Sequence, residues 1–422
     1  MNLRIGPYPL TLRELNGAFG DLGVLIPLEA ALIAINGLNP TTTLLGVGLI
    51  YILAGWYFRL PMPAQPLKAL AALAIALQSP PPVIAAAALL MAAILVFLTA
   101  TRAISLLEKV VPSPVIRGVQ LGLGLLLLKS AYQMIFDKPF LLSGQQIHLD
   151  FGGFTVPAGV VLGVGGVALL LLLVRVRSIP AALVVVALGI AVGLSVEHAG
   201  TWTLGPAPFT PDFPSAGDFW PALVLLVIPQ VPLTLANSVI ATADAAKAYF
   251  GDQAKRATPT RIALSIAVGN LWAGLTGGLP NCHGCGGLTA HYRLGARTPL
   301  ATTFLGLLLI GVALLFGRSA VEVRSLLPAA ALGVLLFYVG VQHLFLGLNV
   351  RSATELGLAV LAAAAAMASG GNLAIGALAG LALYWAARWL ARTLRWPSPS
   401  VPTGQPALRR LVSALERLVP SV

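Results

Sequence analysis

The segment GLPNCHGCGGLTAHYR, residues 278–293, holds both cysteines of the chain and two of its five histidines. Cys282, His283 and Cys285 are residue types that bind metals, but zinc takes three or four ligands in a tetrahedral array, and no obvious fourth is present. The Cys-x-x-Cys spacing also occurs in redox proteins, in a soluble βαβ unit that this apolar context lacks. A third kind of site is a glycine-rich helix start whose backbone N–H groups bind an anion. We favour the anion site and keep a metal-binding or redox protein as an alternative.

A second segment of the same kind occurs half a chain earlier. A shift of 219 residues aligns residues 40–61 with residues 259–280 without gaps, and prolines match at both ends of the blocks. Each block is followed by a Pro- or Gly-broken stretch that is polar at its start, residues 62–77 and 281–296. Such corresponding interrupted segments mark the substrate site of inverted-repeat transporters. We predict two short half-helices, each preceded by extended backbone, whose N-termini meet near the middle of a membrane.

The charges of this arrangement suit a dianion. Two opposed helix N-termini supply roughly +1, and Lys68, expected one turn into the first half-helix, adds one more. Gln65 offers an amide donor, Pro66 suits the first turn of a helix, and glycines let the backbone approach a ligand closely. Lys68 has structural alternatives, an ion pair with Asp21 or Asp244 or a position at the inner membrane surface. The candidate substrate ligands on the two segments are Gln65, Pro66, Lys68, His283, Gly284, Cys285, Gly286 and Gly287.

Two other apolar segments carry polar residues at matching places. They are ELNGAFGDLGVLIPLEAAL (14–32) and PLTLANSVIATADAAKAYFGD (232–252). Asp21 and Asp244 are candidates for proton coupling or for an ion pair, whereas His291 is expected at the membrane interface. The further substrate-binding candidates are Asn16 and Gly20 in the first segment and Asn237 and Ser238 in the second, although Asn and Ser also bond between helices.

The elements that must position these residues are membrane-spanning helices. Of the 422 residues, 58% are hydrophobic and 9% are charged, and the mean hydropathy is +0.90. A soluble core cannot use so much apolar surface, whereas a polytopic membrane protein needs it. At roughly 20 residues a span, the length fits about 12 to 14 spans. The net charge of +12 does not indicate nucleic-acid binding, because the positive residues stand in short loops, as the positive-inside rule requires.

The loop charges give the orientation and the number of crossings. With the N-terminus inside, the outside turns carry Lys138, Arg318 and Arg324, and the inside turns carry Arg59, Arg102, Lys109, Arg117, Arg175, Arg177, Lys247, Lys255, Arg256, Arg261, Arg293, Arg297 and Arg351. Both termini are basic and therefore cytoplasmic, so the number of spans is even, and fourteen fits best. We expect an all-α protein of seven plus seven inverted spans, with residues 1–219 as the first repeat and 220–400 as the second. Residues 401–422 are expected to form an amphipathic helix on the inner membrane surface.

Three stretches, ELNGAFGDLG, LPMPAQPLKALAA and PNCHGCGGLTAHYRLGART, resemble the molybdate transporter family of plants and microbes, relatives of the sulfate permeases. The resemblance spans nearly the whole chain. It implies the fourteen-span inverted-repeat fold shared with sulfate permeases and nucleobase transporters, divided into a core and a gate, with spans one, three, eight and ten at the site. No segment corresponds to the STAS domain of sulfate permeases. Where proton-coupled relatives have a glutamate in the eighth span, this chain has Asn237, which puts coupling at that position in doubt.

These observations predict a secondary transporter for a tetrahedral oxyanion, molybdate before sulfate, with alternating access, and not an enzyme. A sulfate or other small-anion permease is the alternative within the fold. We expect an integral multi-pass protein of the cell (inner) membrane, with no cofactor, no bound metal and no nucleic-acid partner. A homodimer is a further expectation, since relatives with this fold often dimerise.

Overall fold

The computed structural model describes residues 3–5, 8–104, 112–150, 152–175, 181–196, 203–210, 212–323, 327–350 and 352–393. The regular secondary structure of these residues is helical apart from three pairs of very short strands. The helices before residue 200 are α1 (Leu12–Ala18), η1 (Phe19–Asp21), α2 (Leu22–Ala34), α3 (Pro40–Phe58), α4 (Lys68–Ala76), α5 (Pro81–Ala100), α7 (Ser113–Tyr132), η2 (Gln133–Asp137), α8 (Ala158–Leu173) and α9 (Ala181–Val196). Those after it are α10 (Ala216–Pro221), η3 (Ala222–Val227), α11 (Ile228–Leu233), η4 (Thr234–Ile240), α12 (Ala241–Phe250), η5 (Gly251–Arg256), α13 (Pro259–Thr276), α14 (Cys285–Leu294), α15 (Pro299–Val323), α16 (Ala329–Leu348), α17 (Ala353–Ala368) and α18 (Leu373–Thr393).

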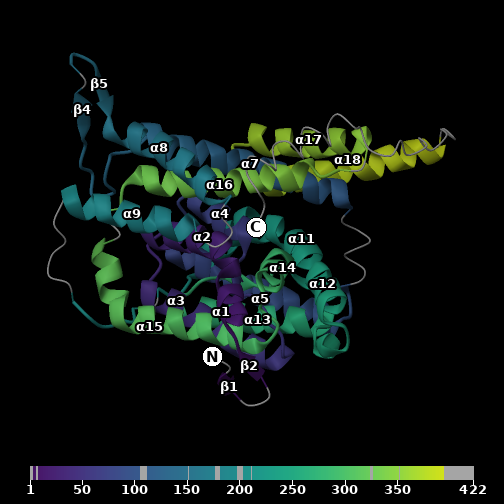
Figure 1. The fold of residues 1–422 in the computed structure, drawn as a ribbon. Coiled ribbons are helices and arrows are strands. Elements are labelled where there is room, and N and C mark those ends of the chain that lie inside the picture. Colours follow the sequence, from purple (N-terminus) through teal and green to yellow (C-terminus); the bar gives the residue numbers. More distant parts are fainter. Residues whose placement is uncertain are drawn as a thin grey trace.

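The helices form two packed groups (Figure 1). Helices α7, α8, α9, α16, α17 and α18 make one group, which we call the gate group. The other, the core group, contains α3 packed on α15 and α5 packed on α13, with the short helices α4 and α14 near the middle of the view. The predicted division into two bodies therefore has a counterpart in the packing.

Seven helical stretches in the described part of the chain are long and apolar enough to cross a membrane. They are Pro40–Phe58, Pro81–Ala100, Ser113–Asp137, Ala216–Arg256, Pro299–Ala320, Ala329–Leu348 and Leu373–Leu390. Their outer faces expose large apolar side chains, such as Leu307 and Leu315 of α15, which would be buried in a protein surrounded by water. The predicted class, an all-helical polytopic membrane protein, is confirmed, whereas the number of fourteen spans stays a prediction.

The two aligned sequence blocks fold alike. They become α3 and α13, each with proline at its first position, and capped by the side chains of Asn39 and Thr258, which accept backbone N–H bonds. Each helix ends on a residue with positive φ, Arg59 at 60° and Gly277 at 64°. This left-handed ending turns the chain sharply and starts the interrupted segment that follows.

The interrupted segments meet at their starts. After α3 the chain runs through strand β3 (Gln65–Pro66) into α4, and after α13 it runs through β6 (Asn281–Cys282) into α14. β3 and β6 pair antiparallel, with Gln65 opposite Cys282, and the Leu67 N–H donates to the Pro280 carbonyl at 3.0 Å. The structure therefore has the two half-helices preceded by extended backbone that the sequence predicts. The other strand pairs are β1 (Leu3–Ile5) with β2 (Tyr8–Leu10) and β4 (His148–Asp150) with β5 (Thr155–Pro157).

The helical stretch from residue 216 to 256 is continuous but irregular. Pro221, Pro229 and Pro232 lie within it, and proline has no N–H to donate to the preceding turn. The stretch widens into π-helical turns at η3 and η4. Such π-turns occur frequently at functional sites, and η4 carries Asn237 and Ser238. The predicted C-terminal amphipathic helix, residues 401–422, lies outside the described residues.

Candidate functional site

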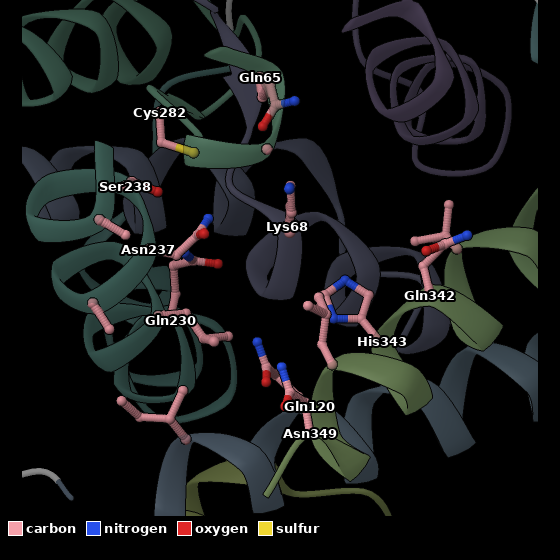
Figure 2. Close-up of a pocket in the computed structure, with 18 of the residues that line it drawn as sticks. Gln65, Lys68, Gln120, Gln230, Asn237, Ser238, Cys282, Gln342, His343 and Asn349 are labelled. Atoms are coloured by element: carbon pink, nitrogen blue, oxygen red, sulfur yellow. The ribbon is translucent and has the colours of Figure 1, made fainter. Parts of the chain in front are cut away.

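A cavity of about 430 Å³ lies between the core group and the gate group (Figure 2). From the core group it is lined by Asp21, Gln65, Lys68, Gln230, Leu233, Ala236, Asn237, Ser238, Ala241, Cys282, Gly286, Gly287 and Ala290. From the gate group and the residue after it come Ser113, Ile116, Arg117, Gln120, Tyr338, Val339, Gln342, His343, Leu346 and Asn349. The cavity thus contains residues from both half-helices and from η4, which are far apart in the sequence.

Lys68 supplies the positive charge of this cavity. It is the first residue of α4, not one turn into the helix as predicted, because the extended strand continues to Pro66 and Leu67 is the N-cap. Its ammonium group points toward Gln65 and Cys282 (Figure 2). Among the described residues no carboxylate lies within 4.0 Å of Lys68 Nζ, so the alternative of an ion pair with Asp21 or Asp244 is not realised.

Backbone N–H groups at the two helix starts add to this charge. The Leu288 N–H already donates to Gly284 O at 3.2 Å, which leaves the N–H groups of the first three residues of α14 without an intrahelical acceptor. In α4 the Leu70 N–H donates at 2.9 Å to Oε1 of Gln230, a side chain of α11. The α4 start is therefore partly capped by the other half of the chain, and the α14 start is the freer of the two.

Three glycines at the start of α14, Gly284, Gly286 and Gly287, serve different purposes. A Cβ on Gly287 would lie 2.7 Å from Asp21 Oδ1, and a Cβ on Gly284 would overlap Gln65 Oε1. These two glycines therefore permit close packing. A Cβ on Gly286 would meet only Lys68 Nζ, at 4.0 Å. Gly286 thus exposes its backbone to the cavity beside the ammonium group.

Asp21, in the wall of the cavity, is held in place by hydrogen bonds. Its Oδ2 accepts from the Tyr51 hydroxyl at 2.6 Å, and its Oδ1 accepts from Gln65 Nε2. His291 Nε2 lies 3.9 Å from Asp21 Oδ2, and His291 Nδ1 bonds Gly17 O at 2.7 Å. His291, expected at the membrane interface, has a side chain that is fully buried within the protein.

His283 has both ring nitrogens engaged away from the cavity. Nδ1 donates to Pro63 O at 2.7 Å, and Nε2 bonds Ser265 Oγ at 2.8 Å. The backbone carbonyl of His283 accepts from Thr242 Oγ1 at 2.8 Å. His283 thereby fixes the start of α14.

The described residues contain no group of three His, Cys, Asp or Glu side chains that could hold a metal. Cys282 and Cys285 are both free thiols.

The remaining predicted residues divide into two sets. Gln65, Lys68, Asn237, Ser238, Gly286, Gly287 and Asp21 line the cavity. Pro66, His283, Gly284, Cys285 and Asp244 do not. Pro66 lies in β3 and not in the first turn of a helix, and Asp244 is exposed on α12. Asn16 lies in α1 and Gly20 in η1, and whether they reach the cavity stays a prediction.

Several polar cavity residues of the gate group were not predicted. Gln120 lies in the apolar helix α7, and Gln342 and His343 lie in α16. Polar side chains inside apolar helices are functional candidates by default. That signal was available in the sequence, but the sequence does not show which helices face the half-helices.

Comparison with known proteins identifies the family. Residues 13–127 and 222–342 match the family model described as molybdate transporter of the MFS superfamily. The chain is 33% identical over 404 residues to molybdate transporter 2 of Arabidopsis thaliana, covering 88% of this chain and 86% of the relative. The chain belongs to the molybdate transporter family. Another relative, molybdate transporter 1 of Chlamydomonas reinhardtii, is 30% identical, with 92% of this chain and 94% of the relative covered.

The fold of this molybdate transporter family member is similar to that of solved anion transporters. The transmembrane domain of the cyanobacterial bicarbonate transporter BicA superposes with a TM-score of 0.59 at 17% identity, covering 90% of this chain and 98% of that domain. Murine SLC26A9, an anion transporter in the inward-facing state, superposes with a TM-score of 0.63 at 15% identity, covering 92% of this chain and 69% of that chain. This chain therefore shares the transmembrane fold of BicA and SLC26A9.

Proposed function

We propose that this chain carries molybdate across a membrane and binds it beside Lys68, between the N-termini of α4 and α14. The observation that carries the proposal is the Lys68 ammonium group, which has no carboxylate partner in the described part of the chain, in a cavity that also contains the exposed backbone of Gly286. The relatives named as molybdate transporters supply the substrate. The predicted identification as a molybdate transporter rather than an enzyme or a metal-binding protein agrees with the family.

The electrostatics of the site suit an oxyanion. Lys68 provides one positive charge, and each half-helix start provides about half a charge more. Gly286 and Gly287 N–H groups can point at anion oxygens, and the amides of Asn237 and Gln65 are further donors. Molybdate and sulfate have the same charge and shape, so the dimensions of this cavity would decide between them.

The cavity suggests how access alternates. Its rim contains the exposed residues Ser113, at the start of α7, and Asn349, after the end of α16. Arg117 stands beside this rim on the side that the loop charges mark as cytoplasmic. We infer an inward-facing state with cytoplasmic termini, in which movement of the core group against the gate group would close this mouth and open the opposite one.

The inverted repeat is part of this proposal. Seven helical segments of the described chain precede residue 197 when α1 to α2 are taken as one segment and α7 with η2 as another, with α3, α4, α5, α8 and α9 as the rest. Seven follow it when α10 to η5 are taken as one segment, with α13, α14, α15, α16, α17 and α18 as the others. This supports fourteen crossings, with 1–219 and 220–400 as the repeats. A dimer, predicted from the fold, is left as a prediction.

Binding of molybdate to the purified protein, with sulfate as competitor, tests the proposal. Lys68→Ala should weaken binding at least 100-fold, about 3 kcal/mol, because it removes the cation from a partly desolvated site. Lys247→Ala is the matched control, since Lys247 is exposed on α12 outside the cavity. Equal displacement by sulfate would indicate a general oxyanion carrier. Unchanged binding to Lys68→Ala, or no binding to the wild type, would overturn the proposal.

A further inference from the structure

A buried pair of acceptors lies behind the anion cavity. Asp21, Tyr51, Gln65 and His291 are each at most 1% exposed. His291 Nδ1 bonds the Gly17 carbonyl at 2.7 Å, and a carbonyl oxygen only accepts, so Nδ1 carries the ring proton. The neutral ring then has its lone pair on Nε2, which has no hydrogen-bond partner among the described residues. That lone pair lies 3.9 Å from Asp21 Oδ2.

Two facing acceptors in a buried site are unfavourable without a proton between them. One proton on His291 Nε2 would turn the repulsion into a charge-assisted hydrogen bond after the two atoms approach by about an ångström. The other oxygen of Asp21 is engaged by Gln65 Nε2, and Tyr51 already donates to Oδ2. The unfilled position on this network is therefore that of one proton.

The net charge of the cavity explains why a proton should bind together with the anion. Lys68 and the two helix starts supply roughly +2. Asp21 also lines the cavity, and as a carboxylate it reduces the total to about +1. A dianion would then leave the buried site with a net charge of about −1. One proton taken up by the Asp21–His291 pair restores the balance.

Three other carboxyl groups lie on the elements around the pair, and they differ in whether they are hydrogen-bonded, exposed or buried. Glu14 accepts the backbone N–H of Arg297 at 2.8 Å, and Asp244 is exposed on α12. Glu29 of α2 is buried, and its Oε1 has no partner, so it is the rival proton carrier. The titratable groups on these elements are Arg13 and Glu14 of α1, Glu29 of α2, Tyr51 and Tyr57 of α3, Lys68 of α4, Cys282 of β6, His283 after it, Asp244, Lys247 and Tyr249 of α12, Cys285, Tyr292 and Arg293 of α14, and Arg297.

We propose that Asp21 and His291 together form a proton-binding site that takes up one proton from the aqueous cavity when molybdate binds, and that releases it with the anion. The new N–H bond forms on His291 Nε2, the proton comes from water in the cavity, and the same bond breaks on release. The inference rests on the proposed molybdate site. Gln65 connects the two sites, because it lines the cavity and donates to Asp21.

Calorimetry of molybdate binding to the full-length protein tests this proposal. The measurement is repeated at one near-neutral pH in two buffers with different ionisation enthalpies. The difference between the two observed binding enthalpies, divided by the difference between the two ionisation enthalpies, gives the number of protons bound. We expect uptake approaching one proton in the wild type, and a Kd that falls by up to about tenfold for each pH unit of acidification. Asp21→Asn should bind molybdate with no proton uptake, because its amide can donate to His291 Nε2 as the proton would. His291→Gln should lose the uptake as well, and Glu29→Gln should keep it.

The outcomes separate the two proposals. No molybdate binding to the wild type would refute the anion site itself. Binding with an enthalpy independent of the buffer would leave molybdate transport standing and overturn the proton site. Uptake that persists in both Asp21→Asn and His291→Gln, or disappears in Glu29→Gln, would also overturn it. If either pair variant fails to fold, the wild-type buffer dependence and the Glu29→Gln protein still decide.

Discussion

Gly286 and Gly287 are neighbours in α14, yet the structure predicts opposite responses to alanine. A methyl group on Gly286 meets nothing nearer than Lys68 Nζ, at 4.0 Å, and projects into the cavity. A methyl group on Gly287 would lie 2.7 Å from both Asp21 Oδ1 and Gln65 Nε2, and 2.8 Å from Pro63 Cβ. The first change should therefore affect binding and the second should affect folding.

The magnitudes follow from these contacts. Gly286→Ala should leave the fold intact or stabilise it by up to about 1 kcal/mol, because alanine is the better helix former. It should displace the anion from one backbone N–H, and losing a hydrogen bond to a charged group costs about 1.5–3 kcal/mol, or roughly 10- to 150-fold in Kd. Gly287→Ala overpacks a region that includes a rigid proline, which costs about 1–3 kcal/mol of stability.

Thermal unfolding and molybdate binding are measured on both variants in the same detergent. Gly311→Ala in α15 is the matched control, because its added methyl group meets no atom within 4 Å. If Gly286→Ala bound molybdate as tightly as the wild type, the anion would not lie at the start of α14. If Gly287→Ala were as stable as the wild type, the packing argument would be refuted.

Three further predictions concern other contacts of the site. Gln230→Leu leaves the buried N–H of Leu70 without its acceptor, and should lower stability by about 1–3 kcal/mol; an unchanged unfolding temperature would contradict the capping role. Asn237→Glu places a carboxylate on the cavity wall that Lys68 shares (Figure 2), and should weaken molybdate binding more than about tenfold by repulsion; equal affinity in calorimetry would place the anion elsewhere. Cys285→Ser should retain uptake of molybdate into proteoliposomes, because this thiol does not line the cavity, and loss of uptake would favour the redox alternative.

The interrupted segments could be predicted because local chemistry determines them. Proline and glycine break two apolar runs at matched positions. Because proline has no N–H to donate within a helix, each run is expected to begin with extended backbone and to continue as a short helix. The exact start of α4 was missed, since Pro66 is compatible with both a first helical turn and a strand. The pairing of β3 with β6 joins segments more than 200 residues apart, which no local pattern specifies.

The environment of individual side chains depended on tertiary contacts. His291 lies in the last turn of α14 beside the polar residues Tyr292 and Arg293, and for that reason the sequence suggests an interfacial position. In the structure its side chain is buried and bonds the carbonyl of Gly17 in α1, a contact that the sequence does not show. Whether Lys68 pairs with an acid depended on where Asp21 lies, and Asp21 is engaged by Tyr51 and Gln65 instead. Sequence periodicity gives the faces of helices but not their partners.

The antiparallel pairing of β3 and β6 also restricts how affinity can vary during a transport cycle. It joins the two half-helices within one body, so sliding of that body past the gate group carries both N-termini and Lys68 together. The ligands contributed by α4 and α14 then keep the same spacing whether the site faces outward or inward. Molybdate should accordingly bind with similar strength on both sides, and net flux should follow the concentration and proton gradients rather than a switch between a tight and a loose site.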